Sequence, residues 1–289
     1  MSLNDNHLES NVTFFIHNHK CGGHSIRDAL IETDTPFIWT YDIAIDQNSE
    51  FKQSILRGKS TERLLIFGHP DKIPPSIYDR ETMLFLNSLY TCAKLIFPSR
   101  HPISLLVSWL EYIRTRLIDH FKEPTEANSK MIADFLRLWS VYSGDSEESS
   151  RAKDFSHPYD SAYKNIRRWI DASRDQRTVY HFNQSYNLFF PQRAALSEAI
   201  NQGVRTPLPI SRWVRSGKLF VYDSEQCSAI AMERLGSEVG ELFAKRLART
   251  RLNVSKKSLR PVSPDEWADL ETYLATITDA DLQIYRAAV

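Results

Sequence analysis

Short apolar runs, each ended by polar or turn-forming residues, recur along the chain and predict buried β-strands. Residues 12–17 are rich in β-forming side chains and are followed by a lysine, two glycines and a serine. Runs of about four to eight apolar residues with such boundaries are typical of strands that are covered on both faces. The other expected strands are residues 37–41, 63–67, 93–97, 178–182 and 219–222.

Segments with apolar residues at helical spacing lie between these runs. Pro102 can occupy the first turn of a helix, and apolar residues such as Leu105 and Trp109 then recur up to about Leu117. Further helices are expected at 25–31, 131–142, 224–235, 239–247 and 264–288. Strands alternating with helices predict an α/β fold, with a central parallel sheet and helices on both faces.

No internal repeat and no clear linker divides the 289 residues, so a single domain over 1–289 is expected. Residues 1–10 are polar and are expected to form a loose N-terminus. Residues 143–157 are rich in serine and charged side chains, which favours a polar loop or a lid.

Charge and cysteine content narrow the classes of function. Lysine and arginine number 36, as do aspartate and glutamate, so bulk charge gives no support for a nucleic-acid partner. The three cysteines are scattered, which indicates neither a disulfide framework nor a zinc site. No signal peptide and no run of ~20 apolar residues is visible, so we expect a cytoplasmic protein without a membrane span. The sequence carries no signal for the oligomeric state.

The segment after the first expected strand has the features of an anion-binding loop. It places Lys20 before Gly22 and Gly23, and a plausible helix begins near Ser25. Glycines let backbone N–H groups approach an anion, and the helix N-terminus and the lysine add positive charge. The order differs from the Walker A loop of ATPases, where the glycines precede the lysine. The alternative is a glycine turn beside a surface lysine.

Arg100 follows the expected strand 93–97, and Ser108 lies eight residues further on, in the next helix. An arginine fork suits phosphate, and ligands of open α/β sheets bind beyond the carboxyl ends of strands. Arg100 and Lys20 are both expected at such ends. The alternative is an arginine in a structural salt bridge and a buried helical serine.

Together, the two segments resemble the PAPS-dependent sulfotransferases. The loop His19-Lys20-Cys21-Gly22-Gly23-His24-Ser25 is similar to the PKTGGTS loop of the carbohydrate-type and bacterial members, and Arg100-His101-Pro102 through Ser108 is similar to the family's 3′-phosphate motif. The resemblance implies a P-loop NTPase-like fold, the donor 3′-phosphoadenosine 5′-phosphosulfate (PAPS) and the product adenosine 3′,5′-bisphosphate (PAP), with no metal. It implies that the loop Lys20, Cys21, Gly22, Gly23, His24 and Ser25 holds the 5′-phosphosulfate, and that Arg100 and Ser108 hold the 3′-phosphate.

The resemblance also reaches, more weakly, residues 253–257, where Ser255 and Lys256 match an Asn-x-Ser segment of such enzymes. Residues 242–264 carry seven basic side chains and no acidic side chain. This pattern is compatible with a basic flap over the 3′-phosphate or with a solvated helix face. In the loop, His19 replaces the usual proline and His24 the usual threonine, so an imidazole N–H would have to replace a hydroxyl donor.

His69 is the expected catalytic base and Lys20 the expected partner of the leaving oxygen. His69 lies just after the expected strand 63–67. In this position it resembles the strand-end histidine that serves as base in many sulfotransferases. An unperturbed imidazole pKa of ~6.5 suits proton abstraction near neutrality. The alternatives are a turn histidine before Pro70, or a base among the rivals His17, His19, His24 and Glu111.

The sequence therefore predicts sulfuryl transfer from PAPS to a hydroxyl, or less readily a nitrogen, of a soluble small-molecule or natural-product acceptor. A saccharide or glycolipid acceptor is the second expectation. A nucleotide-dependent kinase would use Asp42 or Asp223 to bind Mg²⁺. A nucleotide-binding module without catalysis is the non-enzyme alternative.

Overall fold

The computed structural model describes residues 11–45, 63–70, 80–122, 129–151, 167–168, 170–171, 184–188, 210–250, 262–276 and 280–288. The expected strand 178–182, the N-terminus 1–10 and the candidate residues Ser255 and Lys256 lie outside these ranges. Two compact units account for the chain. Unit 1 comprises Met1–Arg100, Gln184–Leu252 and Gln283–Val289, and unit 2 comprises His101–Asn183 and Asn253–Leu282.

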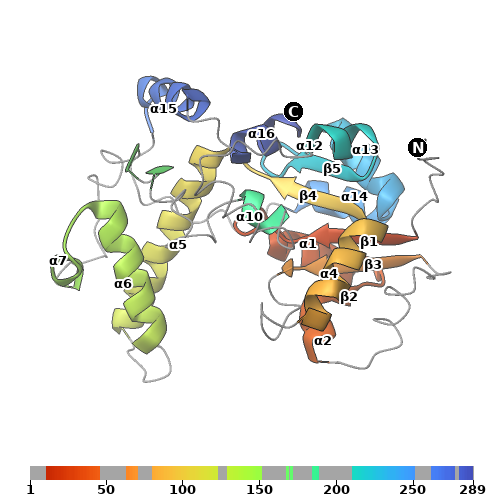
Figure 1. Cartoon of the computed structure of the whole chain (residues 1–289), viewed down its shortest axis with the longest axis horizontal. Helices are drawn as coiled ribbons and strands as arrows, with labels where there is room; N and C mark the ends of the chain where they lie inside the picture. Colours follow the sequence, from red (N-terminus) through yellow and green to blue (C-terminus); the bar gives the residue numbers. More distant parts are fainter. Residues whose placement is uncertain are drawn as a thin grey trace. The chain divides into compact units, whose positions relative to one another are not determined.

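Unit 1 is built on a five-stranded sheet of order β2-β3-β1-β4-β5, in which every neighbouring pair is parallel (Figure 1). The central strand pairs through Phe15 with Phe67 on one side and with Ile96 on the other. The expected parallel α/β sheet is thus confirmed. The strands are β1 (Val12–Ile16), β2 (Ile38–Trp39), β3 (Leu64–Gly68), β4 (Lys94–Ser99) and β5 (Leu219–Asp223).

Helices cover both faces of this sheet, because alternate residues of each strand supply two separate cores. Phe14 of β1 packs in a cluster with helices α4, α10, α12 and α16, whereas the next residue, Phe15, packs with α1, α13 and α14. Both phenylalanines are fully buried. The covering helices are α1 (Gly23–Glu32), α4 (Arg80–Cys92), α10 (Gln184–Leu188), α12 (Ile210–Arg215), α13 (Ala229–Glu238), α14 (Glu241–Arg249) and α16 (Ala280–Arg286).

Three sequence expectations about unit 1 need correction at their boundaries. The strand expected at 37–41 is shorter, because helix α2 (Thr40–Ile45) begins directly after Trp39. The helix expected at 224–235 starts later, since residues 224–226 form a turn and Ser228 caps α13 by accepting a hydrogen bond from the Ala231 N–H. The helix expected at 25–31 begins two residues earlier, at Gly23.

Unit 2 is helical in its described residues, with α5 (Pro102–Lys122), α6 (Ser129–Ser143), α7 (Glu147–Arg151) and α15 (Pro264–Thr276). Its core is an apolar stripe of α5, packed with residues such as Trp139 of α6 and Leu270 of α15. The stripe consists of Ile103, Leu106, Leu110, Ile113 and Leu117, which recur every three or four residues.

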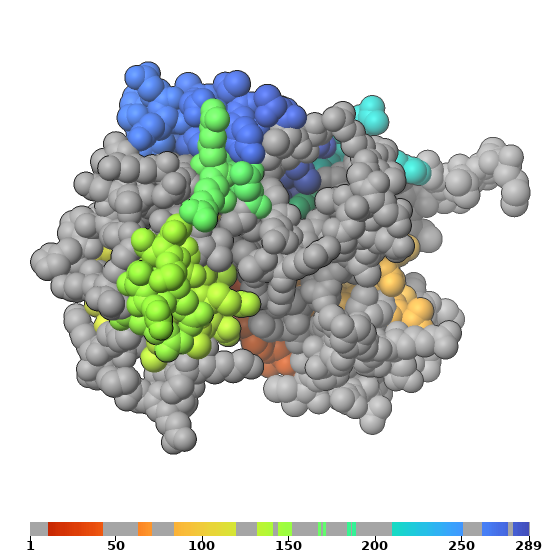
Figure 2. Space-filling view, turned by 60° about the vertical axis from the view of Figure 1, so that its left-hand side comes forward, coloured from red at the N-terminus to blue at the C-terminus, as the bar shows by residue number. Residues whose placement is uncertain are grey.

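The loop or lid expected at 143–157 is helical in part, because α7 occupies its middle; residues 152–157 lie outside the described ranges. Figure 2 shows α6 and α7 as one contiguous yellow-green surface. Across the part of the chain that the structure describes, every helix is too short or too polar to cross a membrane.

Candidate anion-binding site

The loop after β1 lies at the topological switch point of the sheet, where successive strands are added on opposite sides of β1. β1 is flanked by β3 on one side and β4 on the other, and the chain enters α1 directly from this loop. Ligands of open α/β sheets bind in the crevice at such a point, beyond the carboxyl ends of the strands. Lys20 has φ 61° and Gly22 has φ 78°, so two loop residues adopt the left-handed conformation. For a lysine this conformation is less favourable than for a glycine.

The two glycines of the loop are needed for different reasons. A Cβ on Gly22 would meet nothing within 4 Å, so this residue is required for its positive φ. A Cβ on Gly23 would lie 1.5 Å from Nε2 of His17, so this residue is required for the space that an imidazole fills. Gly23 also opens α1, whose first-turn N–H groups have no acceptor within the helix and can face an anion.

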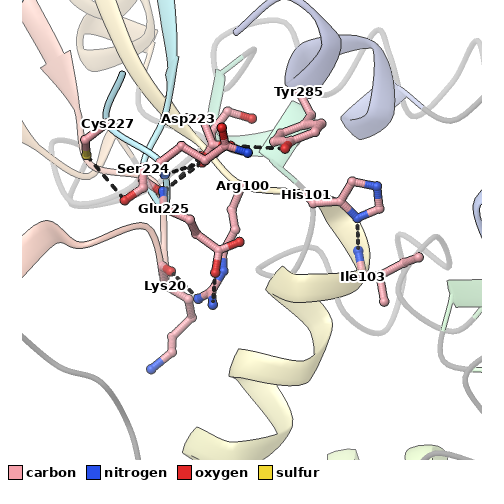
Figure 3. Close-up of polar contacts among 11 residues, drawn as sticks. Lys20, Arg100, His101, Ile103, Asp223, Ser224, Glu225, Cys227 and Tyr285 are labelled. Atoms are coloured by element: carbon pink, nitrogen blue, oxygen red, sulfur yellow. Dashed lines mark hydrogen bonds and ion pairs between the residues drawn. The ribbon is translucent and has the colours of Figure 1, made fainter. Parts of the chain in front are cut away.

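The Arg100 side chain is hydrogen-bonded to this loop. Arg100 and Lys20 both follow the carboxyl ends of strands, as the sequence predicted. Nη1 of Arg100 donates to the Lys20 carbonyl oxygen at 3.1 Å, and its Nη2 donates to Glu225 Oε1 at 2.6 Å (Figure 3). The Lys20 side chain extends away from this guanidinium. We call Lys20, Arg100, Asp223, Ser224 and Glu225 the arginine cluster. It brings a lysine and an arginine to one edge of the sheet.

A buried glutamine holds the backbone of Arg100. The Gln184 side chain is fully buried, and its Oε1 accepts from the Arg100 N–H at 3.0 Å while its Nε2 donates to the Arg100 carbonyl at 2.7 Å. The same Oε1 accepts from Asn18 Nδ2 at 2.9 Å and from Ser99 Oγ at 3.0 Å. Asn18 Oδ1 in turn accepts from Asn187. One amide of α10 therefore ties the ends of β1 and β4 together.

Three histidines stack beside the loop, and we call His17, His19 and His69 the histidine stack. His69 lies in the middle, with its ring centroid 4.0 Å from that of His17 and 4.0 Å from that of His19. Burial, helped by the nearby His19, His24 and Arg27, lowers the pKa of His17 from 6.5 to about 3. His17 is therefore neutral at physiological pH.

His69 is placed at the end of β3, as predicted, but it is only 7% exposed. His17 follows β1 instead of lying within it, which corrects its expected place in the strand.

The remaining loop residues differ in their exposure. Cys21 is buried and receives a hydrogen bond from Asn18 Nδ2 at 3.1 Å, and burial raises the pKa of its thiol to about 12. Any contact of Cys21 with a ligand would thus be made by its backbone. His24 is exposed on the first turn of α1, and Ser25 is buried.

Other predicted residues belong to unit 2 or to α14. Ser108 and the rival base Glu111 belong to α5 of unit 2, where Glu111 is buried, and a joint role of Ser108 and Arg100 stays a prediction. In the basic stretch, Lys245 pairs with Glu241 at 3.4 Å and Arg246 pairs with Glu32. These two side chains thus form the solvated helix face that was the alternative to a flap.

The arrangement of these side chains does not resemble a metal site. The three imidazoles face one another as a stack, and among the described residues no three histidine, cysteine or acidic side chains could hold a metal ion together. Asp223 ends β5, but its Oδ1 accepts from the Glu225 N–H and its Oδ2 accepts from the Tyr285 hydroxyl.

Sequence reasoning missed Asn18, Gln184 and Glu225. Asn18 could have been noticed, because it directly follows an apolar run at a strand end. Nothing in the local sequence distinguishes Gln184 or Glu225 from surface residues. Comparison with known proteins adds no assignment, since no family model, curated protein or solved structure matches the chain.

Proposed function

We propose that the protein is a PAPS-dependent sulfotransferase that transfers a sulfuryl group to a hydroxyl of a soluble small-molecule acceptor. The observation that carries the proposal is the contact between the Arg100 guanidinium and the carbonyl of Lys20. It joins a cation to a glycine-containing loop at the switch point of a parallel sheet. Two anionic groups, one at the loop and one at Arg100, are what a nucleotide with phosphates on both its 5′ and 3′ positions would present.

The proposed reaction needs three groups of this site. A neutral imidazole, His69, takes the proton of the acceptor hydroxyl as its oxygen attacks the sulfur. The bond from sulfur to the bridging phosphate oxygen breaks, and the ammonium of Lys20 neutralises the charge that develops on that oxygen. First-turn N–H groups of α1 hold the 5′-phosphate in line with the acceptor.

A kinase is the less favoured enzyme class for this site. Mg²⁺ would need a carboxylate at a strand end. Of the two acids considered for this role, Asp42 lies within α2, and Asp223 ends β5. Its two oxygens already accept hydrogen bonds from the Glu225 N–H and the Tyr285 hydroxyl. Lys20 also precedes the loop glycines, in contrast to the Walker order.

A nucleotide-binding module without catalysis would use the same loop and Arg100, but it would need no base. The histidine stack favours the enzyme, because a buried imidazole at a neighbouring strand end is a group that binding alone does not require. The proposed acceptor is a soluble small molecule with a hydroxyl group. A saccharide or glycolipid is the second candidate.

Calorimetric binding of PAP, ADP and ATP–Mg²⁺ to the wild type and to Arg100→Ala tests the proposal. We expect PAP to bind more tightly than ADP without Mg²⁺, and we expect Arg100→Ala to lose about 10²-fold of PAP affinity, the loss typical of a charged hydrogen-bonded contact. Lys94→Ala, which changes a cation at the opposite ends of the strands, is the matched control. Preference for ATP–Mg²⁺, or equal binding of PAP and ADP, would contradict the proposal.

A further inference from the structure

Glu225 occupies an edge of the Arg100 guanidinium that an oxyanion could use. Nε–H and one Nη2–H of arginine point along the same edge, which is the edge that binds carboxylates and phosphates with two hydrogen bonds. In this structure Nη2 donates to Glu225 Oε1 at 2.6 Å. Nε is buried and makes no hydrogen bond to any residue that the structure describes. Glu225 thus uses one of the two donors on this edge.

The third nitrogen of Arg100 is already committed to the protein. Nη1 donates to the Lys20 carbonyl, and Gln184 holds the backbone N–H and carbonyl of the same residue. The guanidinium is therefore fixed from the side of the loop, and its Nε–Nη2 edge is directed toward Glu225 (Figure 3). An incoming anion would meet a pre-positioned arginine and would compete with the carboxylate for Nη2.

The backbone that carries Glu225 is held firmly, whereas its side chain has freedom to leave. Asp223 Oδ1 accepts from the Glu225 N–H at 2.7 Å. The N–H and the hydroxyl of Ser224 both donate to the Ser99 carbonyl at 2.9 Å. The Glu225 side chain itself is 41% exposed, compared with 20% for Arg100. A change of rotamer would move the carboxylate into solvent without any change in the turn.

We propose that the carboxylate of Glu225 occupies the phosphate position on Arg100 until the 3′-phosphate of a nucleotide displaces it, so that Glu225 sets how tightly this phosphate is bound. This inference rests on the proposed function for the identity of the ligand. A phosphate dianion can bind Nε and Nη2 together, whereas the carboxylate makes one bond and carries one charge. A nucleotide that lacks the 3′-phosphate leaves the ion pair in place. Glu225 therefore lowers the affinity for ligands that bear a phosphate at this position, and it leaves the affinity for nucleotides without that phosphate unchanged.

The test compares wild type, Glu225→Gln and the control Glu238→Gln. Glu238 pairs with Lys94 at 3.3 Å, so its variant removes one negative charge at the other end of the strands. Affinity is measured for PAP and for adenosine 5′-phosphate by calorimetry. In parallel, the rate of Arg100 modification by phenylglyoxal is followed by mass spectrometry with and without inorganic phosphate. We expect Glu225→Gln to bind PAP about tenfold more tightly, to bind adenosine 5′-phosphate as the wild type does, and to show stronger protection of Arg100 by phosphate.

The outcomes separate the inference from the proposed function. If the wild type binds PAP and Glu225→Gln binds it no better, the inference is overturned and the proposed function stands. If neither the wild type nor the two variants bind PAP, but phosphate protects Arg100 more strongly in Glu225→Gln than in the wild type, the role of Glu225 holds and the proposed function fails. If phosphate protects Arg100 equally in both and PAP is not bound, both are overturned. Equal tightening in Glu238→Gln would reduce the effect to net charge and overturn the inference.

Discussion

The arginine cluster and the histidine stack lie at the same edge of one sheet, but different forces hold them together. In the arginine cluster, charged groups meet through directed hydrogen bonds, such as the 2.6 Å contact between Arg100 and Glu225. In the histidine stack, rings face one another at 4.0 Å, and burial keeps at least His17 neutral. The first arrangement suits the recognition of an anion, and the second suits the acceptance of a proton. In the proposed function, the arginine cluster would bind the nucleotide and the histidine stack would supply the base.

Removing the central ring of the stack is expected to have the largest effect on turnover. His69→Ala should lower kcat by about 10²–10⁴-fold, because the acceptor proton loses its base. The affinity for PAP should stay unchanged, since the arginine cluster is left intact. Sulfuryl transfer from PAPS to a simple phenol measures the first quantity, and calorimetry measures the second. His19→Ala is the comparison variant, and a greater loss there than in His69→Ala would assign the base to His19.

Breaking the support of the arginine cluster is expected to cost stability as well as recognition. Gln184→Ala would leave the backbone N–H and the backbone carbonyl of Arg100 without their side-chain partner, each worth about 1–3 kcal/mol, for a total of about 3 kcal/mol. Urea denaturation measures the free energy of unfolding. Gln226→Ala removes an exposed glutamine side chain and should change it by less than about 0.5 kcal/mol. Equal stability of the two variants would show that the buried amide contributes little.

Gly23 lies where the loop contacts the histidine stack, and its substitution tests how much this contact contributes to stability. Gly23→Ala should lower the free energy of unfolding by about 1–3 kcal/mol, because the new Cβ overlaps the His17 ring. Gly22→Ala should cost about 1 kcal/mol through its positive φ alone. If overlap is the cause, His17→Ala will reduce the penalty of Gly23→Ala in a double-mutant cycle. Additive effects of the two changes would refute this explanation.

Near neutral pH, the smallest expected effect is the pH dependence that His17 contributes. Its pKa is about 3 in the folded protein and ~6.5 in the unfolded chain, so the unfolded chain binds the proton more readily. The contribution to stability is complete above ~6.5 and is lost as the pH falls toward 3, by at most ~1.4 kcal/mol per pH unit. His17→Gln should flatten the pH dependence of urea unfolding over this range. An unchanged slope in that variant would indicate that other groups cause it.

The sheet and its loop could be predicted because strands buried on both faces leave unbroken apolar runs, and the residues that end such runs come together at one edge. Lys20, His69 and Arg100 were found in this way. The boundary of β2 could not be predicted, because Thr40 favours strands locally and yet begins a helix. Glu225 and Gln184 could not be predicted either, because their partners lie 125 and 84 residues away in the chain.

The buried amide of Gln184 also has a consequence for the order in which the protein acquires its binding ability. Its hydrogen bond to Asn18 spans 166 residues. Polypeptides emerge from the ribosome beginning at the amino end, so β1 and its loop are made long before α10. Until residue 184 has been made, the backbone of Arg100 lacks the partner that fixes it beside Lys20. A nascent or prematurely ended chain would therefore carry the loop sequence without the buried amide that holds Arg100 beside it.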